Sequence, residues 1–133
     1  MIEFLGVSKH YPNRQGALKD VRFKIRSGEM AFITGHSGAG KSTLLKLLML
    51  IEKPSSGLIK IGRENWNQVM TDQVPLFRRR IGMVHQNNLL IPNKSVFENI
   101  ALPMEICGAK PSEIAPRVKV AMTKVGLASK SEA

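Results

Sequence analysis

The stretch GHSGAGKS, from Gly35 to Ser42, decides the fold that this sequence predicts. It fits the pattern G-x-x-x-x-G-K-[ST] at every fixed position, which is typical of a loop that wraps backbone N–H groups around a phosphate. Glycines let such a loop turn sharply and approach a ligand closely. Lys41 is expected to contact the β- and γ-phosphates, and the Ser42 hydroxyl to ligate Mg²⁺. The alternative is an ordinary glycine turn with an exposed lysine.

The segments on either side of the loop favour the phosphate-binding interpretation. Met30 to Thr34 is almost continuously apolar, which is typical of a strand buried on both faces of a parallel sheet. Ser42 to Met49 is rich in good helix formers, and a helix N-terminus favours a bound anion. Strand, glycine loop and helix therefore follow in the order that the motif requires. The residues predicted to bind the phosphates are Gly35, His36, Ser37, Gly38, Ala39, Gly40, Lys41, Ser42 and Thr43.

The rest of the chain predicts further strands and helices around this unit. Residues 2–7 and 18–25 read as strands that pair in antiparallel fashion. Residues 58–62 read as a short strand, and Ile81 to Gln86 as a second buried strand. Residues 73–80 are expected to form a short basic helix or a turn. Helices are expected over residues 95–102 and 112–127, and the latter has an apolar face at helical spacing formed by Ile114, Val118, Ala121, Met122 and Val125.

Length and composition are those of an ordinary globular domain. The chain has 133 residues, of which 43% are hydrophobic and 23% are charged. No apolar run approaches the roughly 20 residues that a membrane-spanning helix needs. Met1 to Phe4 lacks the basic region of a secretory signal, and the single cysteine, Cys107, excludes an intrachain disulfide. We expect a cytoplasmic protein, with any link to a membrane made through a partner.

The formal net charge of +10 raises the possibility of a nucleic-acid partner. The basic residues are spread from Lys9 to Lys130, and the longest run is only Arg78 to Arg80. Single-strand binders interleave a basic stripe with aromatic residues, and this sequence has no such stripe. We expect no nucleic acid as a partner. A basic nucleic-acid-binding protein remains an alternative that steep, salt-dependent retention on DNA would support.

Two motifs resemble those of ATP-binding-cassette (ABC) ATPases. SGAGKSTLL, from Ser37 to Leu45, resembles their Walker A motif, and IGMVHQ, ending at Gln86, resembles their Q-loop. The resemblance covers nearly the whole chain and is greatest to the cell-division branch, including His36 inside the loop. Lipoprotein-release and macrolide-export ATPases share much of the pattern and remain alternatives.

The resemblance implies an α/β fold, the P-loop NTPase fold of an ABC nucleotide-binding domain. It implies an N-terminal portion with an antiparallel β subdomain, a P-loop strand–helix unit and the start of a helical subdomain. Residues 1–133 would then form an incomplete domain. Residues 1–94 would be the core with Walker A and the Q-loop, and residues 95–133 the start of the helical subdomain. The implied cofactors are ATP and Mg²⁺, and the implied partners are an integral membrane protein and a second copy of the full-length ATPase.

The resemblance also assigns roles to residues outside the glycine loop. Tyr11 matches the aromatic residue that stacks on adenine, although it could be an ordinary surface tyrosine at a strand end. Gln86 matches the glutamine that contacts Mg²⁺ and the attacking water and couples the site to the membrane partner. The implied catalytic residues are therefore Lys41 and Gln86, and the implied metal ligands are Ser42 and Gln86. His85 departs from the family, which usually has an aromatic residue there.

Two motifs of a complete ABC ATPase are absent from these 133 residues. There is no L-S-G-G-Q signature, and the two aspartates, Asp20 and Asp72, do not follow an apolar strand as the Walker B aspartate does. We therefore expect the N-terminal portion of a longer ATPase, which by itself does not hydrolyse ATP at a useful rate. The alternative is a module that binds nucleotide or the membrane partner without turnover.

Overall fold

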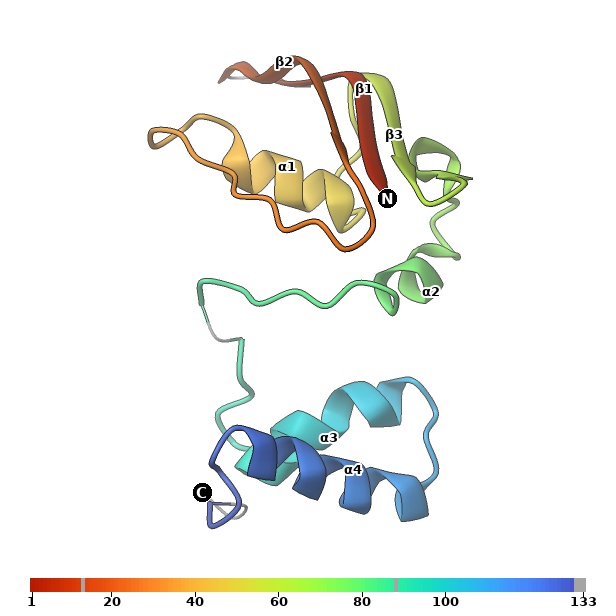
Figure 1. The fold of residues 1–133 in the computed structure, drawn as a ribbon. Helices are drawn as coiled ribbons and strands as arrows, with labels where there is room; N and C mark the ends of the chain where they lie inside the picture. The colour runs from red at the N-terminus through yellow and green to blue at the C-terminus, as the bar shows by residue number, and fades with distance from the viewer. Residues whose placement is uncertain (13, 88, 131–133) are drawn as a thin grey trace. The chain divides into compact units, whose positions relative to one another are not determined.

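The structure is a computed structural model that describes residues 1–12, 14–87 and 89–130 (Figure 1). The chain forms two compact units, Met1–Gly82 and the described residues from Met83 onward. No helix among the described residues is long and apolar enough to cross a membrane. In chain order the elements are β1 (Ile2–Tyr11), β2 (Arg14–Ile25), α1 (Lys41–Leu48), β3 (Ser56–Ile61), β4 (Glu64–Asn65), the 3-10 helix η1 (Trp66–Gln68), α2 (Val74–Arg78), α3 (Val96–Ile106) and α4 (Pro111–Lys124).

The first unit is built on an antiparallel sheet with the strand order β2-β1-β3-β4. Phe4 in the central strand β1 pairs with Phe23 on one side and with Ile59 on the other. The rings of Phe4 and Phe23 stack with their centroids 4.5 Å apart. The register confirms the predicted antiparallel pairing of residues 2–7 with residues 18–25.

Helix α1 lies against one face of this sheet and completes the core (Figure 1). The structure confirms the predicted helix, which buries two leucines, Leu44 and Leu47, on one side. The Trp66 indole N–H donates to the carbonyl oxygen of Leu48 at 2.8 Å, which joins η1 to the end of α1. The buried apolar cluster comprises Phe4, Val7, Leu18, Leu44, Leu47, Ile59, Trp66 and Val69.

The prediction of two buried strands, at residues 30–34 and 81–86, is wrong for this structure. Neither segment belongs to a strand, and the side chains of Phe32 and Val84 are 84% and 98% exposed. A strand of a parallel sheet needs neighbouring strands to take its backbone hydrogen bonds and cover its faces. No strand of the described sheet pairs with either segment, because β1 to β4 hydrogen-bond among themselves.

The second unit is a pair of helices, α3 and α4. Their shared core consists of Ala101, Ile114, Val118 and Met122. The structure confirms the two predicted helices, but it buries only part of the predicted apolar face of α4, because Ala121 and Val125 are exposed. A helix buries only the stripe that faces its neighbour, and here that stripe runs along the i, i+4, i+8 positions Ile114, Val118 and Met122.

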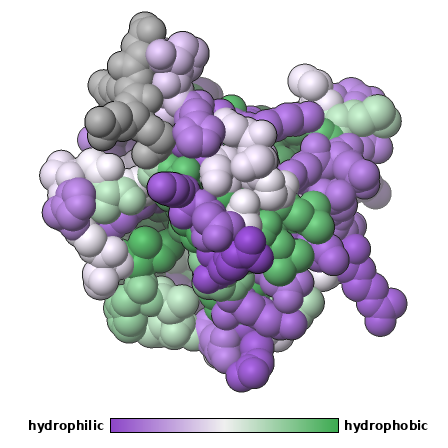
Figure 2. Space-filling model, turned by 90° about the horizontal axis from the view of Figure 1, so that it is seen from above, coloured by the Kyte–Doolittle hydropathy of each residue, from purple (hydrophilic) through white to green (hydrophobic). Residues whose placement is uncertain are grey.

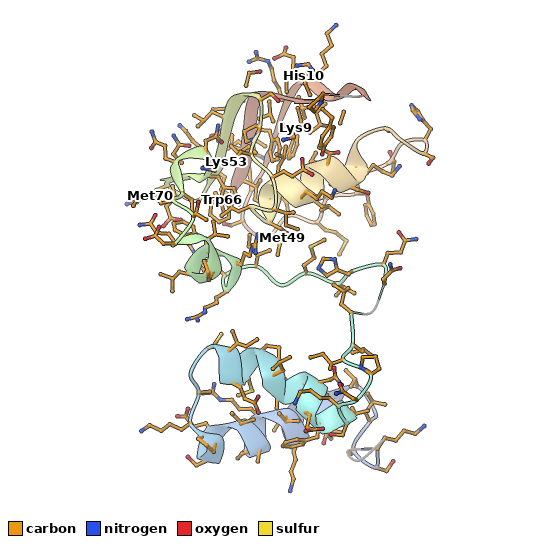
Figure 3. The ribbon with its side chains drawn as sticks, turned by 180° about the vertical axis from the view of Figure 1, so that it is seen from behind. Lys9, His10, Met49, Lys53, Trp66 and Met70 are labelled. Carbon is orange, nitrogen blue, oxygen red and sulfur yellow. The ribbon has the colours of Figure 1, made fainter. Side chains whose placement is uncertain are left out.

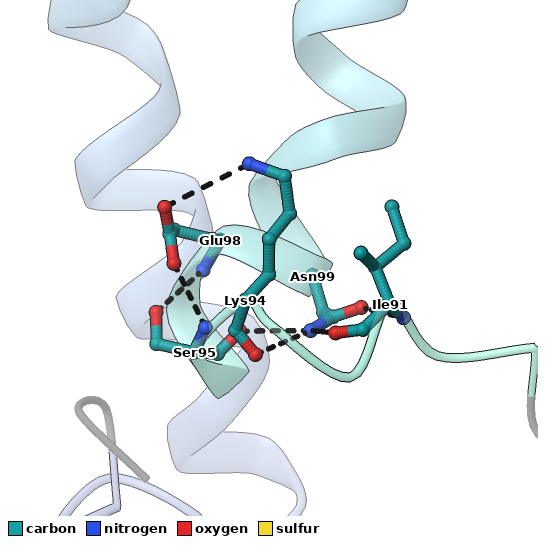
Figure 4. Close-up of polar contacts among 5 residues, drawn as sticks. All are labelled: Ile91, Lys94, Ser95, Glu98 and Asn99. Atoms are coloured by element: carbon teal, nitrogen blue, oxygen red, sulfur yellow. Dashed lines mark hydrogen bonds and ion pairs between the residues drawn. The ribbon is translucent and has the colours of Figure 1, made fainter.

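The start of α3 is fixed by a local network of polar contacts (Figure 4). Ser95 caps the helix: its hydroxyl accepts from the Glu98 N–H at 3.2 Å, while the Ser95 N–H donates to the Glu98 carboxylate at 2.8 Å. The bond from the Ser95 N–H is the main cause of the lowered pKa of Glu98, because it stabilises the charged carboxylate. Asn99 accepts from the Ile91 N–H at 2.8 Å and donates to the Lys94 carbonyl oxygen at 2.9 Å. These bonds join the segment before α3 to the first turn of the helix.

Candidate functional site

The glycine loop, residues 35–42, leads directly into α1. Gly35, Gly38 and Gly40 have φ angles of 150°, 81° and 92°, which lie in the left-handed region that side chains rarely adopt. At Gly40 a side chain is also excluded by packing, because a Cβ there would lie 2.2 Å from the carbonyl oxygen of Ala17. The last glycine of the loop therefore rests directly on β2.

Lys41 closes the loop from its other end. Its Nζ donates to the carbonyl oxygens of Gly35 and His36, at 2.7 and 2.8 Å. The Lys41 ammonium group thus lies beside the start of the loop, although the Lys41 backbone forms the first residue of α1. Within the loop, Nδ1 of His36 lies 2.7 Å from the carbonyl oxygen of Ser37. Residues 35–42 include no acidic side chain, so the loop carries positive charge.

The first turn of α1 adds partial positive charge next to the glycine loop. The first backbone N–H groups of a helix have no acceptor within the helix, and the helix dipole places partial positive charge there. Ser42 is exposed at this position, whereas Thr43 is buried. Backbone N–H groups, a lysine ammonium and an exposed hydroxyl are the groups that bind a phosphate and its magnesium ion. The residues present therefore fit a magnesium–phosphate group.

Tyr11 lies at the end of β1 and is tied to Glu52. Its hydroxyl donates to the Glu52 carboxylate at 2.6 Å. The same carboxylate lies 3.2 Å from Nζ of Lys9 and 3.3 Å from Nζ of Lys46, which belongs to α1. The Tyr11 hydrogen bond lowers the pKa of Glu52 most, and the two lysines lower it further against the opposing effect of desolvation.

Lys9 makes two further contacts beside Tyr11 and Glu52. Lys9, on β1, donates to the carbonyl oxygen of Lys53, in the segment after α1, at 2.8 Å (Figure 3). The Lys9 ammonium also lies 5.2 Å from the centroid of the Tyr11 ring. The end of β1 and the segment that follows α1 are thus held together by several polar contacts. Sequence reasoning missed Glu52, because it lies 41 residues from Tyr11 and belongs to no motif.

The predicted site residues are divided between the two units. Tyr11 and the loop residues from Gly35 to Thr43 all belong to the first unit, where α1 connects them. Gln86 belongs to the second unit and is exposed. The roles of Gln86 toward metal and water therefore stay predictions. The division of the domain at residue 94 also stays a prediction, while the compact units divide after Gly82.

The basic run from Arg78 to Arg80 is engaged within the first unit. Arg78 donates to the carbonyl oxygens of Met49 and Leu50, at 2.8 and 3.1 Å. Arg80 forms an ion pair with Glu64. Arg78 and Arg80 therefore help to hold the first unit together.

Comparison with known proteins gives a consistent result for the whole chain. The family model described as "ABC transporter" matches residues 18–133. The cell division ATP-binding protein FtsE of Escherichia coli (strain K12) is 46% identical over 132 residues, which cover 99% of this chain and 60% of that protein. The methionine import ATP-binding protein MetN of Cupriavidus necator is 40% identical over 97% of this chain and 38% of that protein.

A solved structure shows the same fold. The ATP-binding cassette MJ0796, in a dimeric post-hydrolysis state bound to ADP and Pi, superposes with a TM-score of 0.88 at 30% identity. The match covers 99% of this chain and 60% of that one, so the chain spans about three fifths of the length of FtsE and of this cassette. The fold is that of an N-terminal portion of an ABC nucleotide-binding domain, and the chain belongs to the ABC transporter family.

Proposed function

We propose that this chain binds ATP with Mg²⁺ at the loop from Gly35 to Thr43, as the nucleotide-binding part of an ABC-type ATPase. The observation that carries this proposal is the pair of hydrogen bonds from Lys41 to the carbonyl oxygens of Gly35 and His36. They place an ammonium group beside the loop that leads into the N-terminus of α1. The related cassette MJ0796 binds ADP and Pi, which supports a nucleotide as the ligand.

Each predicted residue has a distinct role in this proposal. Lys41 would exchange its two carbonyl partners for oxygens of the β- and γ-phosphates, because a charged phosphate is the stronger acceptor. Ser42 would ligate the metal, and the backbone of Gly38, Ala39 and Gly40 would surround the phosphate. The metal ion supplies neutralisation of the phosphate charge when bound. Tyr11 would stack on the adenine, and Gln86 would contact the metal and the attacking water.

For the full-length protein we propose an FtsE-type function in bacterial cell division. It would act as a homodimer on the inner face of the cell membrane, where ATP binding and hydrolysis drive an FtsX-like membrane partner. The 46% identity to FtsE of Escherichia coli supports this assignment. The 40% identity to MetN supports a second candidate, the ATPase subunit of an import transporter. Lipoprotein-release and macrolide-export ATPases are further alternatives within the same family.

The chain of 133 residues is expected to bind ATP without hydrolysing it. Hydrolysis needs a carboxylate that orients the attacking water, and neither Asp20 nor Asp72 follows an apolar strand. Asp20 is instead paired with Arg22 at 2.9 Å on the surface. The test is isothermal titration of the chain with ATP, with and without Mg²⁺, beside a phosphate-release assay.

The matched variant for this test is Lys41→Ala. We expect Mg²⁺-dependent binding by the unsubstituted chain, at least a tenfold loss of affinity in the variant, and no turnover above background in either. Turnover that disappears in Lys41→Ala would contradict the proposal that this chain only binds. No binding of ATP to the unsubstituted chain would contradict the proposed site itself.

A further inference from the structure

We propose that Glu52 is a positioning residue that holds the Tyr11 ring in the orientation needed to stack on a nucleotide base. The inference rests on the proposed nucleotide-binding function and concerns the base, whereas the glycine loop concerns the phosphates. It starts from one contact, the 2.6 Å hydrogen bond from the Tyr11 hydroxyl to the Glu52 carboxylate. No sequence motif assigns a role to Glu52.

The carboxylate of Glu52 is itself held in place by three groups. One oxygen accepts from Tyr11 and lies 3.2 Å from Lys9, and the other lies 3.3 Å from Lys46. Only 18% of the side chain is exposed. A carboxylate that is half-buried and contacted on both oxygens has little freedom to move, so the hydroxyl that it binds is fixed as well.

These contacts connect the Tyr11 ring to the glycine loop through one helix, α1. Lys46 is five residues beyond Lys41 on α1, or about 7.5 Å along the helix axis. The backbone N–H of Ile51 donates to the carbonyl oxygen of Lys46 at 2.9 Å, which brings Glu52 back beside the helix. Glu52 therefore ties Tyr11 to the element that carries the phosphate-binding residues.

Packing also holds the hairpin formed by β1 and β2 against the glycine loop. Gly40 packs against the backbone of Ala17 and the side chain of Leu18, both in β2. The β1–β2 hairpin, which carries Tyr11, is thus fixed to the start of α1 by packing and to its later turns by Glu52. With the Lys9 ammonium 5.2 Å from the ring centroid, one face of the ring is occupied by a cation, and a base would stack on the other.

The test separates the base from the phosphates by using two ligands, MgATP and inorganic tripolyphosphate with Mg²⁺. Affinities are measured by isothermal titration for the unsubstituted chain, Glu52→Ala and Glu52→Gln. We expect Glu52→Ala to weaken ATP binding five- to tenfold and to change tripolyphosphate binding by less than twofold. Glu52→Gln keeps an acceptor for the Tyr11 hydroxyl and should restore most of the ATP affinity.

Two further variants check the reasoning. Tyr11→Phe keeps the ring but removes the hydroxyl, so Tyr11→Phe combined with Glu52→Ala should be no weaker than Glu52→Ala alone. Glu64→Gln is the matched control, because it removes a carboxylate that pairs with Arg80 in the same unit. It should leave both affinities unchanged.

A ligand-free measurement tests the contact independently. Tyr11 is the only tyrosine in the chain, so ¹³C labelling of tyrosine yields one Cζ signal. This signal should shift as acid protonates Glu52, and it should not shift over the same pH range in Glu52→Gln. Lys9 and Lys46 are the other charged groups that contact this carboxylate.

The outcomes distinguish this inference from the function on which it rests. Failure of both ligands to bind the unsubstituted chain would overturn the proposed function, and this inference with it. Binding of both ligands with an equal loss, or no loss, in Glu52→Ala would overturn the inference alone. A Cζ signal that does not respond to the protonation of Glu52 would also overturn it.

Discussion

Single residues decide how the glycine loop is attached to the sheet. Three glycines of the loop adopt positive φ angles, but their surroundings differ. A Cβ at Gly40 would collide with the carbonyl oxygen of Ala17 at 2.2 Å, whereas a Cβ at Gly38 would meet nothing within 4 Å. The sequence pattern treats both positions alike, as glycines that let the loop turn sharply. The structure shows that only Gly40 is constrained by packing as well as by conformation.

Replacing Gly40 and Gly38 by alanine separates the constraint of packing from the constraint of backbone conformation. Gly40→Ala should destabilise the first unit by about 3 kcal/mol or more, because conformational strain of about 1–2 kcal/mol adds to a backbone collision. Gly38→Ala should cost only the strain, about 1–2 kcal/mol. Urea unfolding followed by circular dichroism measures both. Equal losses in the two variants would show that the contact between Gly40 and Ala17 does not constrain the loop.

At the scale of elements, α1 is held at both ends by groups outside it. The glycine loop and Lys41 organise its start, and its end passes through Leu50, which has a φ of 54°. Such a left-handed residue often ends a helix, although glycine is usual there. Arg78, from α2, donates to the carbonyl oxygens of Met49 and Leu50, the two residues that follow the helix. The position of α1 depends on these end contacts as well as on Leu44 and Leu47.

Removing the contact at the helix end should loosen the first unit. Arg78→Ala is expected to lower its stability by about 1–3 kcal/mol, because two carbonyl oxygens lose a charged donor. Arg63→Ala, which removes another exposed arginine of the same unit, should change stability by less than about 0.5 kcal/mol. Urea midpoints of the two variants give the comparison. An unchanged midpoint in Arg78→Ala would mean that water replaces the guanidinium at no cost.

At the scale of the whole molecule, large apolar side chains are exposed at several places. In the view of Figure 2, hydrophobic residues reach the surface between hydrophilic ones. The segments predicted as buried strands contribute Met30 and Phe32, each 84% exposed, and Val84. Exposed apolar surface of this kind favours association between molecules.

Concentration-dependent association is therefore expected for this chain in solution. Light scattering coupled to size-exclusion chromatography should show the apparent mass rising with concentration. Phe32→Ser should reduce the rise, because it removes a large exposed apolar side chain from an unpaired segment. Met70→Ser, which changes a 58% exposed side chain elsewhere in the first unit, is the control. A monodisperse monomer with a cooperative thermal transition would contradict this expectation.

The sequence by itself determined the glycine loop, the helix that follows it, the antiparallel strand pair and the two later helices. These features depend on residues close together in the chain, whose spacing and conformational preferences act locally. Only the tertiary structure decided that Tyr11 contacts Glu52, that Gly40 packs on Ala17, and that residues 30–34 are exposed. Those outcomes depend on which distant segments meet. Apolar character predicts a tendency to be buried, but burial itself requires a partner surface, and the described strands leave that segment unpaired.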